Sequence, residues 1–335
     1  MQASALATAT GAATVNEPAA RPRRHPLAAE IVGLRKVYGD VVAVDDVSLS
    51  IAEGEIFGVL GPNGAGKTTT VECAVGLRNP DAGSIRLLGL DPFADRDELH
   101  ELVGVQLQAS AQPAKLRVGE ILALYRSFYR DPADLDELIE VLGLAEKRNV
   151  YYRALSGGQR QRLSVALALI GNPRIAVLDE MTTGLDPGAR RDAWELIRGI
   201  RDRGVTIILV THFMEEAERL CDRVAFIDAG RVVALDTPAG LSARARDTKV
   251  VRFVPSAPFD DAILSAQPEV TRVEHDGSRV VVSGTGDLLN TVIIALHDQG
   301  VVAHDVGFDT SNLEDAFVKL TGNRLNQDHL EGARS

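Results

Sequence analysis

Residues 55 to 70 read EIFGVLGPNGAGKTTT, and this stretch decides the fold of the largest region of the chain. Glu55 to Leu60 is an apolar run that favours a strand, Gly61 to Gly66 is rich in glycine, and Lys67 to Leu77 has helical spacing. A strand, a glycine-rich loop and a helix in this order form a framework for binding phosphate groups. We therefore predict an α/β fold whose loop holds the phosphates of a nucleotide.

The loop also predicts specific chemistry. Its glycines let successive backbone N–H groups face a phosphate, and the following helix adds the positive end of its dipole. Lys67 is expected to place a cation against the β- and γ-phosphates, and Thr68 to offer its hydroxyl to Mg²⁺. The predicted nucleotide-binding residues of this segment are Gly61, Pro62, Asn63, Gly64, Ala65, Gly66, Lys67, Thr68 and Thr69.

A second apolar strand ends in two carboxylates. Residues 175 to 180 read IAVLDE, so Asp179 and Glu180 follow a run typical of a buried parallel strand. The carboxyl ends of such strands are where α/β proteins place their sites. We expect Asp179 to hold Mg²⁺ through water and Glu180 to activate the attacking water as a general base.

The sequence LSGGQ at Leu155 to Gln159 is similar to the signature of the ATP-binding-cassette (ABC) transporter ATPases. The resemblance covers roughly Ala28 to Leu241. It implies an α/β P-loop nucleoside-triphosphatase core with an antiparallel β subdomain and a helical insert. It also implies that two copies pair head to tail around ATP, so that the signature contacts the γ-phosphate held by the opposite subunit. The signature residues that the resemblance assigns to ATP are Ser156, Gly157, Gly158 and Gln159.

Further positions match the family in order along the chain. Tyr38 matches the aromatic residue that stacks on adenine, although a tyrosine at a strand edge is common. Gln106 and Gln108 compete for the glutamine that senses Mg²⁺ and the permease, and the spacing after Val103-Gly104 favours Gln108. Asp186 ends the Thr183-Gly184-Leu185-Asp186 loop, which in the family crosses the dimer interface.

His212 matches the switch histidine that bonds to the γ-phosphate. The resemblance therefore implies three functional sets. The expected catalytic residues are Glu180, His212, Gln108 and Lys67, the expected metal-binding residues are Thr68, Gln108 and Asp179, and Tyr38 and Asp186 join the nucleotide-binding residues. ATP and Mg²⁺ are the implied cofactors.

One position departs from the family. Proline commonly follows the catalytic glutamate, and this chain has Met181. Because proline restricts the backbone, we expect Met181 to loosen this turn slightly without loss of activity.

The tract HFMEEAERLCDR at residues 212 to 223 resembles the type-2 exporter branch, which includes the daunorubicin-resistance ATPases. That branch implies a separate membrane permease, a self-paired ATPase at the cytoplasmic face of the membrane, and efflux of a drug, antibiotic or lipid-like substrate. An alternative is an ABC-type ATPase that acts in assembly or regulation without a permease.

The composition of the chain limits which partners and environments we expect for it. The net charge of −11 over 335 residues disfavours nucleic acid as the main partner, because phosphate binding needs a basic surface. The longest apolar runs are too short for a transmembrane helix, so we expect none. Cys73 and Cys221 stand in apolar helical contexts and are predicted to be buried, reduced thiols.

The pattern after residue 246 differs from the nucleotide-binding region. Strand-like and helical runs follow the order β-α-β-β-α-β, which predicts a small ferredoxin-like α+β domain. A final helix is expected to begin at Ser311, with Glu314 completing a capping box. We predict a disordered tail at 1–26, an ATP-binding domain at 27–246 with its helical subdomain near 110–160, an accessory α+β domain at 247–322, and a second tail at 323–335.

Overall fold

The computed structural model describes residues 26–107, 112–245, 249–309 and 313–321. Residues 1–25 of the tail predicted at 1–26, the tail predicted at 323–335, Gln108 and the predicted helix start at Ser311 lie outside these ranges. Within the described ranges, every helix is too short or too polar to cross a bilayer.

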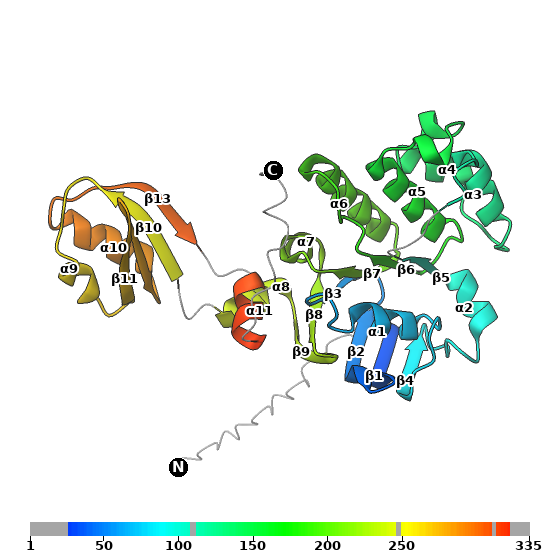
Figure 1. Cartoon of the computed structure of the whole chain (residues 1–335), viewed down its shortest axis with the longest axis horizontal. Coiled ribbons are helices and arrows are strands. Elements are labelled where there is room, and N and C mark those ends of the chain that lie inside the picture. Colours follow the sequence, from blue (N-terminus) through cyan, green and yellow to red (C-terminus); the bar gives the residue numbers. More distant parts are fainter. Residues whose placement is uncertain (1–25, 108–111, 246–248, 310–312, 322–335) are drawn as a thin grey trace, which may run out of the picture.

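A six-stranded sheet forms the centre of the nucleotide-binding region (Figure 1). In spatial order its strands are β5 (Val103–Gln106), β6 (Ile175–Asp179), β7 (Thr206–Thr211), β3 (Ile56–Leu60), β8 (Arg223–Asp228) and β9 (Arg231–Asp236). The first five are parallel, and β9 returns antiparallel to β8 after a turn at Ala229-Gly230, where both residues have positive φ angles.

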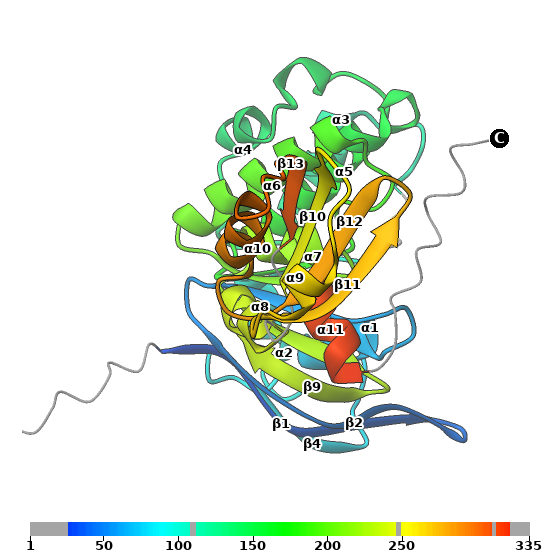
Figure 2. The same cartoon turned by 90° about the vertical axis from the view of Figure 1, so that its left-hand side faces the viewer.

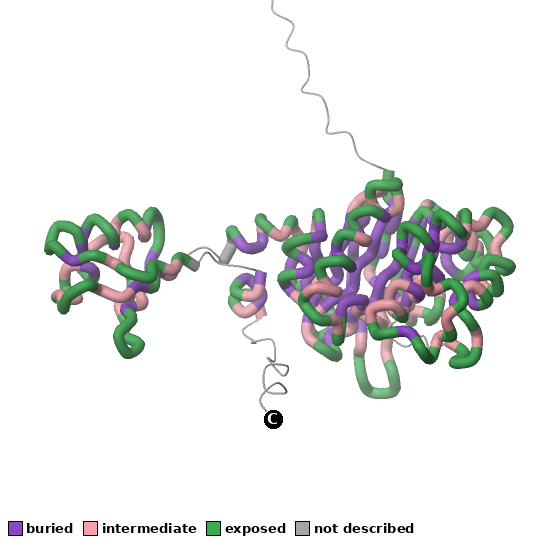
Figure 3. The backbone as a smooth tube through the Cα atoms, turned by 90° about the horizontal axis from the view of Figure 1, so that it is seen from above, coloured by how far each residue is buried: buried purple, intermediate pink, exposed green. Residues whose placement is uncertain are grey.

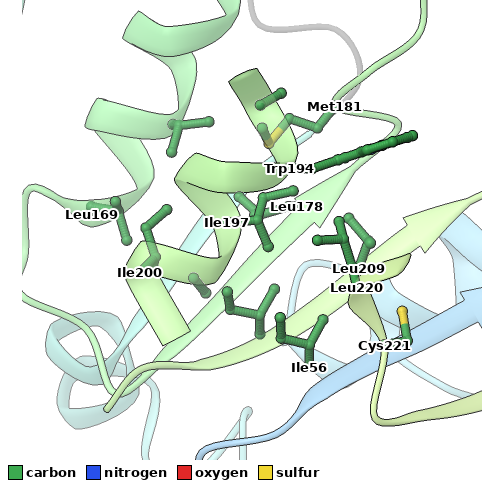
Figure 4. Packing of buried hydrophobic residues seen from close by; sticks show 14 of the residues in the cluster. Ile56, Leu169, Leu178, Met181, Trp194, Ile197, Ile200, Leu209, Leu220 and Cys221 are labelled. Atoms are coloured by element: carbon green, nitrogen blue, oxygen red, sulfur yellow. The ribbon is translucent and has the colours of Figure 1, made fainter. Parts of the chain in front are cut away.

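The inner strands β3, β6 and β7 are buried on both faces of the sheet, which explains why they are continuously apolar rather than alternating. On β3, Ile56 and Leu60 belong to one hydrophobic cluster, and Phe57 and Val59 belong to another. The first cluster packs the sheet against helices, and Figure 4 shows part of it around Ile197.

The second cluster joins the sheet to α1 (Lys67–Ala74) and to a smaller antiparallel sheet. That sheet has the order β2 (Val41–Ala52), β1 (Leu27–Tyr38) and β4 (Ala82–Leu87), and Figure 2 shows it along one side of the molecule. The predicted helix to Leu77 is too long. Gly76 adopts a left-handed φ of 75°, and Leu77 N–H bonds back to Glu72 O, which ends the helix three residues earlier.

The predicted helical insert is confirmed. Its helices cover the first face of the central sheet together with those that follow the later strands. The helices of the nucleotide-binding region after α1 are α2 (Arg96–Leu102), α3 (Val118–Arg126), α4 (Leu135–Val141), α5 (Gly157–Leu169), α6 (Pro187–Asp202), α7 (Met214–Leu220) and α8 (Pro238–Ala245), with short 3₁₀ turns at Ala145–Lys147 and Tyr152–Ala154.

The C-terminal module has the predicted ferredoxin-like order. Its four strands pair antiparallel in the order β11-β12-β10-β13 and enclose a hydrophobic cluster of their own with the two helices (Figure 3). The elements are β10 (Lys249–Pro255), α9 (Ala262–Ser265), β11 (Val270–Asp276), β12 (Arg279–Gly284), α10 (Leu288–His297) and β13 (Ala303–Asp309).

The last helix, α11 (Leu313–Thr321), packs away from this module. It lies against α8 and α7 of the nucleotide-binding region (Figures 1 and 2). Phe317 is fully buried and meets Phe226 of β8 edge-on, with ring centroids 5.4 Å apart. Glu218 of α7 accepts a hydrogen bond from Leu313 N–H at 2.6 Å. The chain therefore returns to the main core after the ferredoxin-like module.

Candidate functional site

The predicted phosphate loop lies between β3 and α1 and requires glycine at its two ends. Gly61 and Gly66 have φ angles of 151° and 96°. A Cβ atom at Gly66 would lie 2.3 Å from the carbonyl oxygen of Ala43, and one at Gly61 would lie 2.0 Å from that of Ile227. Side chains are therefore excluded at both positions, and the loop backbone packs tightly between β2 and β8.

Lys67 lies at the start of α1 and is only 5% exposed. Its Nζ donates hydrogen bonds to the carbonyl oxygens of Gly61 at 2.8 Å and Pro62 at 2.9 Å, so the ammonium group is held over the loop. Burial lowers the pKa of Lys67, and the charges of Glu180 and Asp179 oppose that effect. The acidic end of strand β6 therefore lies close to the ammonium group of Lys67.

Thr68 and Asp179 meet beside this lysine. The Thr68 hydroxyl donates to Asp179 Oδ2 at 3.3 Å, and Asp179 is 1% exposed. Its other oxygen, Oδ1, is buried without a hydrogen-bond partner among the described residues. Burial, followed by the charge of Glu180, raises the pKa of Asp179 to about 6. An orphaned carboxylate oxygen beside a hydroxyl fits the oxygen ligands that Mg²⁺ prefers.

Glu180 and His212 follow the neighbouring strands β6 and β7. His212 Nδ1 lies 3.2 Å from Glu180 Oε1, and the side chains are 20% and 11% exposed. Glu180 has a left-handed φ of 48°, which is uncommon for a residue with a side chain. Its N–H donates to Val210 O at 2.9 Å. Strain of this kind is often found where a side chain must be aimed at a reaction site.

Met181 contributes more than the expected looser turn. Its side chain is 1% exposed and belongs to the main hydrophobic cluster, which also contains Trp194 (Figure 4). Burial of an unbranched apolar side chain anchors the backbone after Glu180 in the core. The expectation of a looser turn considered the backbone alone and left out this packing.

The signature residues begin helix α5. Ser156 is its N-cap: the Ser156 hydroxyl accepts from Gln159 N–H at 3.3 Å, and Gln159 Oε1 accepts from Ser156 N–H at 3.0 Å. A Cβ atom at Gly157 would meet nothing within 4 Å. Among the described residues, no hydrogen bond or ion pair joins this turn to the phosphate loop. The turn is a helix N-terminus with a well-formed cap and open space in front of Gly157.

Asp186 caps helix α6. Its Oδ1 accepts from Gly188 N–H at 2.9 Å and from Ala189 N–H at 3.0 Å, and these two bonds hold its pKa below the usual range. A cavity of about 280 Å³ separates this end of α6 from the signature turn, with Ser156 and Leu185 among its lining residues. The loop predicted to cross a dimer interface therefore lies beside the signature turn of its own subunit.

Tyr38 is placed near the loop by the β1–β2 hairpin. It pairs with Val41, and Ala43, which is two residues further on, packs against Gly66. Tyr38 is 39% exposed, and Lys36 Nζ lies 5.5 Å from the centroid of its ring. An exposed ring at this place fits the predicted contact with adenine, which stays a prediction.

The two competing glutamines differ in what the structure describes. Gln106 ends β5, is 5% exposed, and donates from Nε2 to Leu107 O at 3.0 Å. Its Oε1 is buried and has no hydrogen-bond partner in the described part of the chain. Gln108 lies outside the described residues. Its preferred assignment therefore remains a prediction.

Both cysteines, Cys73 and Cys221, are buried and free, as predicted.

The sequence reasoning missed Glu216 of α7. This carboxyl group is 0% exposed, and its Oε1 accepts from Trp194 Nε1 at 3.2 Å. The available signal was helical spacing, because the apolar Leu220 follows Glu216 by four residues and therefore lies on the same face of α7. An acid on an apolar face predicts a buried partner.

The chain is similar to several known proteins. Residues 44–183 match the family model described as "ABC transporter". The Nod factor export ATP-binding protein I of Mesorhizobium japonicum is 36% identical over 307 residues, which cover 90% of this chain and 88% of that protein. The daunorubicin resistance ATP-binding protein DrrA3 of Streptomyces coeruleorubidus is 36% identical over 299 residues, covering 87% of this chain and 94% of that protein.

A solved structure is also similar. The dimeric post-hydrolysis state of the ATP-binding cassette MJ0796, bound to ADP and phosphate, superimposes with a TM-score of 0.57 at 27% identity. The match covers 62% of this chain and 98% of the cassette. The shared part corresponds to one cassette.

Proposed function

The chain belongs to the ATP-binding-cassette transporter family, and from this premise we propose that it is the ATP-hydrolysing subunit of an exporter. The single observation that carries the proposal is the meeting of four groups at one edge of the sheet. Thr68 touches Asp179, and Glu180 touches His212, beside the buried ammonium group of Lys67. Each has the chemistry that phosphoryl transfer to water requires.

Binding of ATP rests on the loop 61–69. Its backbone N–H groups and the N-terminus of α1 surround the phosphates, and Lys67 turns from the carbonyl groups of Gly61 and Pro62 to the β- and γ-phosphates. Thr68 and Asp179 would hold Mg²⁺, with Gln108 as a further proposed ligand, and the bound ion would neutralise charge on the phosphate oxygens. Tyr38 stacks on adenine.

Hydrolysis needs a base beside the γ-phosphate. Glu180 takes the proton of the attacking water, and its strained backbone fixes the direction of its side chain. His212 lies within hydrogen-bond distance of that carboxylate and has a second ring nitrogen with which to donate to the γ-phosphate. The pair thereby holds the water and the phosphate in one arrangement.

A second copy completes each site. The N-terminus of α5 provides the Ser156 hydroxyl and backbone N–H groups of Gly157 and Gly158, which together bind an anion well. This helix end is exposed in the subunit, and no side chain blocks Gly157. We assign it to the γ-phosphate held by the partner subunit in a head-to-tail dimer. The similar cassette captured as a dimer supports this assignment.

Transport then follows from dimer closure. The exporter names of the relatives support a separate membrane permease, with this subunit bound at the cytoplasmic face of the membrane. ATP binding closes the pair and moves the attached permease, and hydrolysis reopens it. The exported substrate is proposed to be a drug, an antibiotic or a lipid-like molecule. Residues 27–246 form the proposed ATP-binding domain, and 247–322 the accessory region, from which α11 returns to the core.

The test is co-purification from native membranes. The full chain carrying an affinity tag is expressed in its source cells, and membranes are solubilised in mild detergent. We expect a polytopic membrane protein to co-purify, and ATP turnover of the complex to exceed that of the isolated subunit. Recovery of the subunit from the soluble fraction alone, with no membrane protein attached, would instead support an ATPase of assembly or regulation.

A further inference from the structure

Glu216 is a buried acid that the steps described above do not use. It lies on α7, four residues after His212, and is fully buried. Burial raises the pKa of the Glu216 carboxyl, while the hydroxyls of Thr211 and Thr182 and the Trp194 indole N–H oppose that rise. An apolar side chain of similar volume would fill the same space without losing hydration. Packing alone therefore does not explain a carboxyl group here.

The contacts of this acid come from two segments of the chain. Thr182 directly precedes the Thr183–Asp186 loop, and Trp194 stands on α6, the helix that begins after Asp186. On the other side, Thr211 directly precedes His212. Glu216 thus lies between the segment that carries the switch histidine and the segment proposed to cross the dimer interface.

A second contact joins the same two segments. The guanidinium carbon of Arg190 on α6 lies 4.8 Å from the ring centroid of Phe213, the residue after His212. Phe213 N–H donates to Thr211 Oγ1 at 3.0 Å, which fixes the backbone on either side of the histidine. The histidine turn is therefore attached to α6 through Phe213 as well as through the Glu216–Trp194 bond.

The polar groups of this cluster are not fully paired. Glu216 Oε2 and Thr182 Oγ1 are both buried, and neither makes a hydrogen bond of good geometry within the described residues, although the Thr182 and Thr211 hydroxyls lie close enough to Glu216 to lower its pKa. A buried carboxylate oxygen and a buried hydroxyl are complementary, so a small shift of the Thr182 segment toward α7 would be favourable. The cluster can therefore transmit a movement of the Thr183–Asp186 loop to the His212 turn.

We propose that Glu216 is a positioning residue that links the His212 turn to the Thr183–Asp186 loop, so that each ATP site responds to closure at the other. The inference rests on the proposed function, because it requires a dimer in which this loop contacts the second subunit. Glu216 acts through His212 and the loop and touches no nucleotide.

The test separates coupling from folding and from nucleotide binding. Glu216→Met removes the carboxyl group at similar volume, Trp194→Phe removes the N–H donor but keeps a ring, and Glu216→Gln keeps an acceptor for Trp194. Glu215→Gln is the matched control, because Glu215 is exposed on the same helix and pairs only with Arg219 among the described residues. ATP turnover is measured against ATP concentration with the full chain. ATP affinity is measured for each change in a Glu180→Gln background.

We expect Glu216→Met and Trp194→Phe to lower kcat roughly tenfold and to bring the Hill coefficient for ATP to about one. ATP affinity and Tm should stay near those of the parent, and Glu216→Gln should restore most of the kcat and the cooperativity. If Glu216→Met fails to fold, Trp194→Phe decides the question.

Two failures are distinguishable. A parental protein that binds ATP without cooperativity, and without ATP-dependent pairing in the Glu180→Gln background, overturns the proposed dimer and this inference with it. A cooperative parent whose Glu216→Met and Trp194→Phe variants keep the same kcat and Hill coefficient overturns the inference alone.

Discussion

His212 Nδ1 lies 3.2 Å from Glu180 Oε1, although 32 positions separate the two residues in the chain. The register of the central sheet explains their contact. Asp179 pairs with Val210 in the parallel β6–β7 ladder, so the residues that follow these strands leave the same edge side by side. The distance between the base and the histidine is thus fixed by the packed centre of the protein.

Glu180→Gln should abolish turnover while preserving ATP binding. An amide cannot take the proton of water, and general bases contribute about 10² to 10⁴ in rate. Phosphate release should fall by at least about 100-fold, and a dimer should accumulate with ATP in gel filtration. Glu215→Gln, an exposed change on α7, serves as the control. A Glu180→Gln protein that hydrolyses ATP at the parental rate would show that another group is the base.

Lys67→Ala should weaken nucleotide binding itself. The ammonium group is buried over the phosphate loop, and hydrogen bonds to charged groups contribute about 1.5–3 kcal/mol. We expect ATP affinity to fall roughly 10- to 100-fold, measured by calorimetric titration. Lys115→Ala, at an exposed position, is the control. Equal ATP affinities for the two variants would show that Lys67 does not bind the phosphates.

Gly157→Phe should spare the subunit and block closure. Apart from its chain neighbours and the backbone of its own helix, no heavy atom lies within 4 Å of a Cβ atom at this position, so the free subunit should accept a side chain there. We expect parental Tm and ATP affinity, with loss of the ATP-dependent dimer in a Glu180→Gln background. Gly199→Phe is a matched control in another helix, because a Cβ atom there also meets nothing within 4 Å. Loss of ATP binding by the isolated subunit would contradict a role in trans.

Asp179→Asn should stabilise the nucleotide-free protein at neutral pH. The folded-state pKa of about 6 lies above the ordinary value of 3.8, so the folded protein holds this proton more tightly than the unfolded chain does. Burial of the Asp179 charge therefore lowers the free energy of unfolding by its whole amount above pH 6. This destabilisation decreases as the pH falls and is absent below pH 3.8. Asparagine removes this destabilisation.

Urea unfolding in the presence of EDTA measures how the stability difference between the variant and the parent depends on pH. The variant should gain at most about 3 kcal/mol at pH 8 and nothing near pH 3.5. A gain of equal size at both pH values would rule out ionisation of Asp179 as its cause. The same variant should bind Mg²⁺ with ATP more weakly, because one anionic ligand is lost.

Phe317→Ala should destabilise the nucleotide-binding region. Phe317 is fully buried against Phe226, and truncation of a buried phenylalanine costs about 3–5 kcal/mol. Leu320→Ala on the same helix is the control, since Leu320 is 42% exposed and should cost less than about 1 kcal/mol. Thermal unfolding followed with bound ATP measures both. Equal Tm values for Phe317→Ala and the parent would mean that α11 does not stabilise this region.

The phosphate loop and the Asp179–Glu180 strand end were predictable because their signals are local. A glycine loop between a strand and a helix, and an apolar run ending in acids, each fix their own geometry. The ferredoxin-like order was also predictable, because its strands and helices alternate in a distinctive sequence. The strand order of the central sheet cannot be predicted from any single segment. It is this order that places His212 beside Glu180.

The features that escaped prediction depend on distant packing. Glu216 is surrounded by residues of α6 and β7, and nothing near it in the sequence announces Trp194 as its partner. The burial of Met181 likewise depends on the cluster formed with Trp194. Helix α11 shows the same limit at a larger scale, because its amphipathic pattern predicts a buried face without indicating which region covers it.

The docking of α11 has a consequence for how the protein is made. Phe226 lies on a strand beside β3, and its ring partner is supplied only after the whole ferredoxin-like module has been translated. When the nucleotide-binding region has left the ribosome and α11 has not yet been translated, an apolar surface at α7 and α8 is therefore still exposed. During this interval of translation the surface can bind chaperones or aggregate, and the interval ends only when α11 docks.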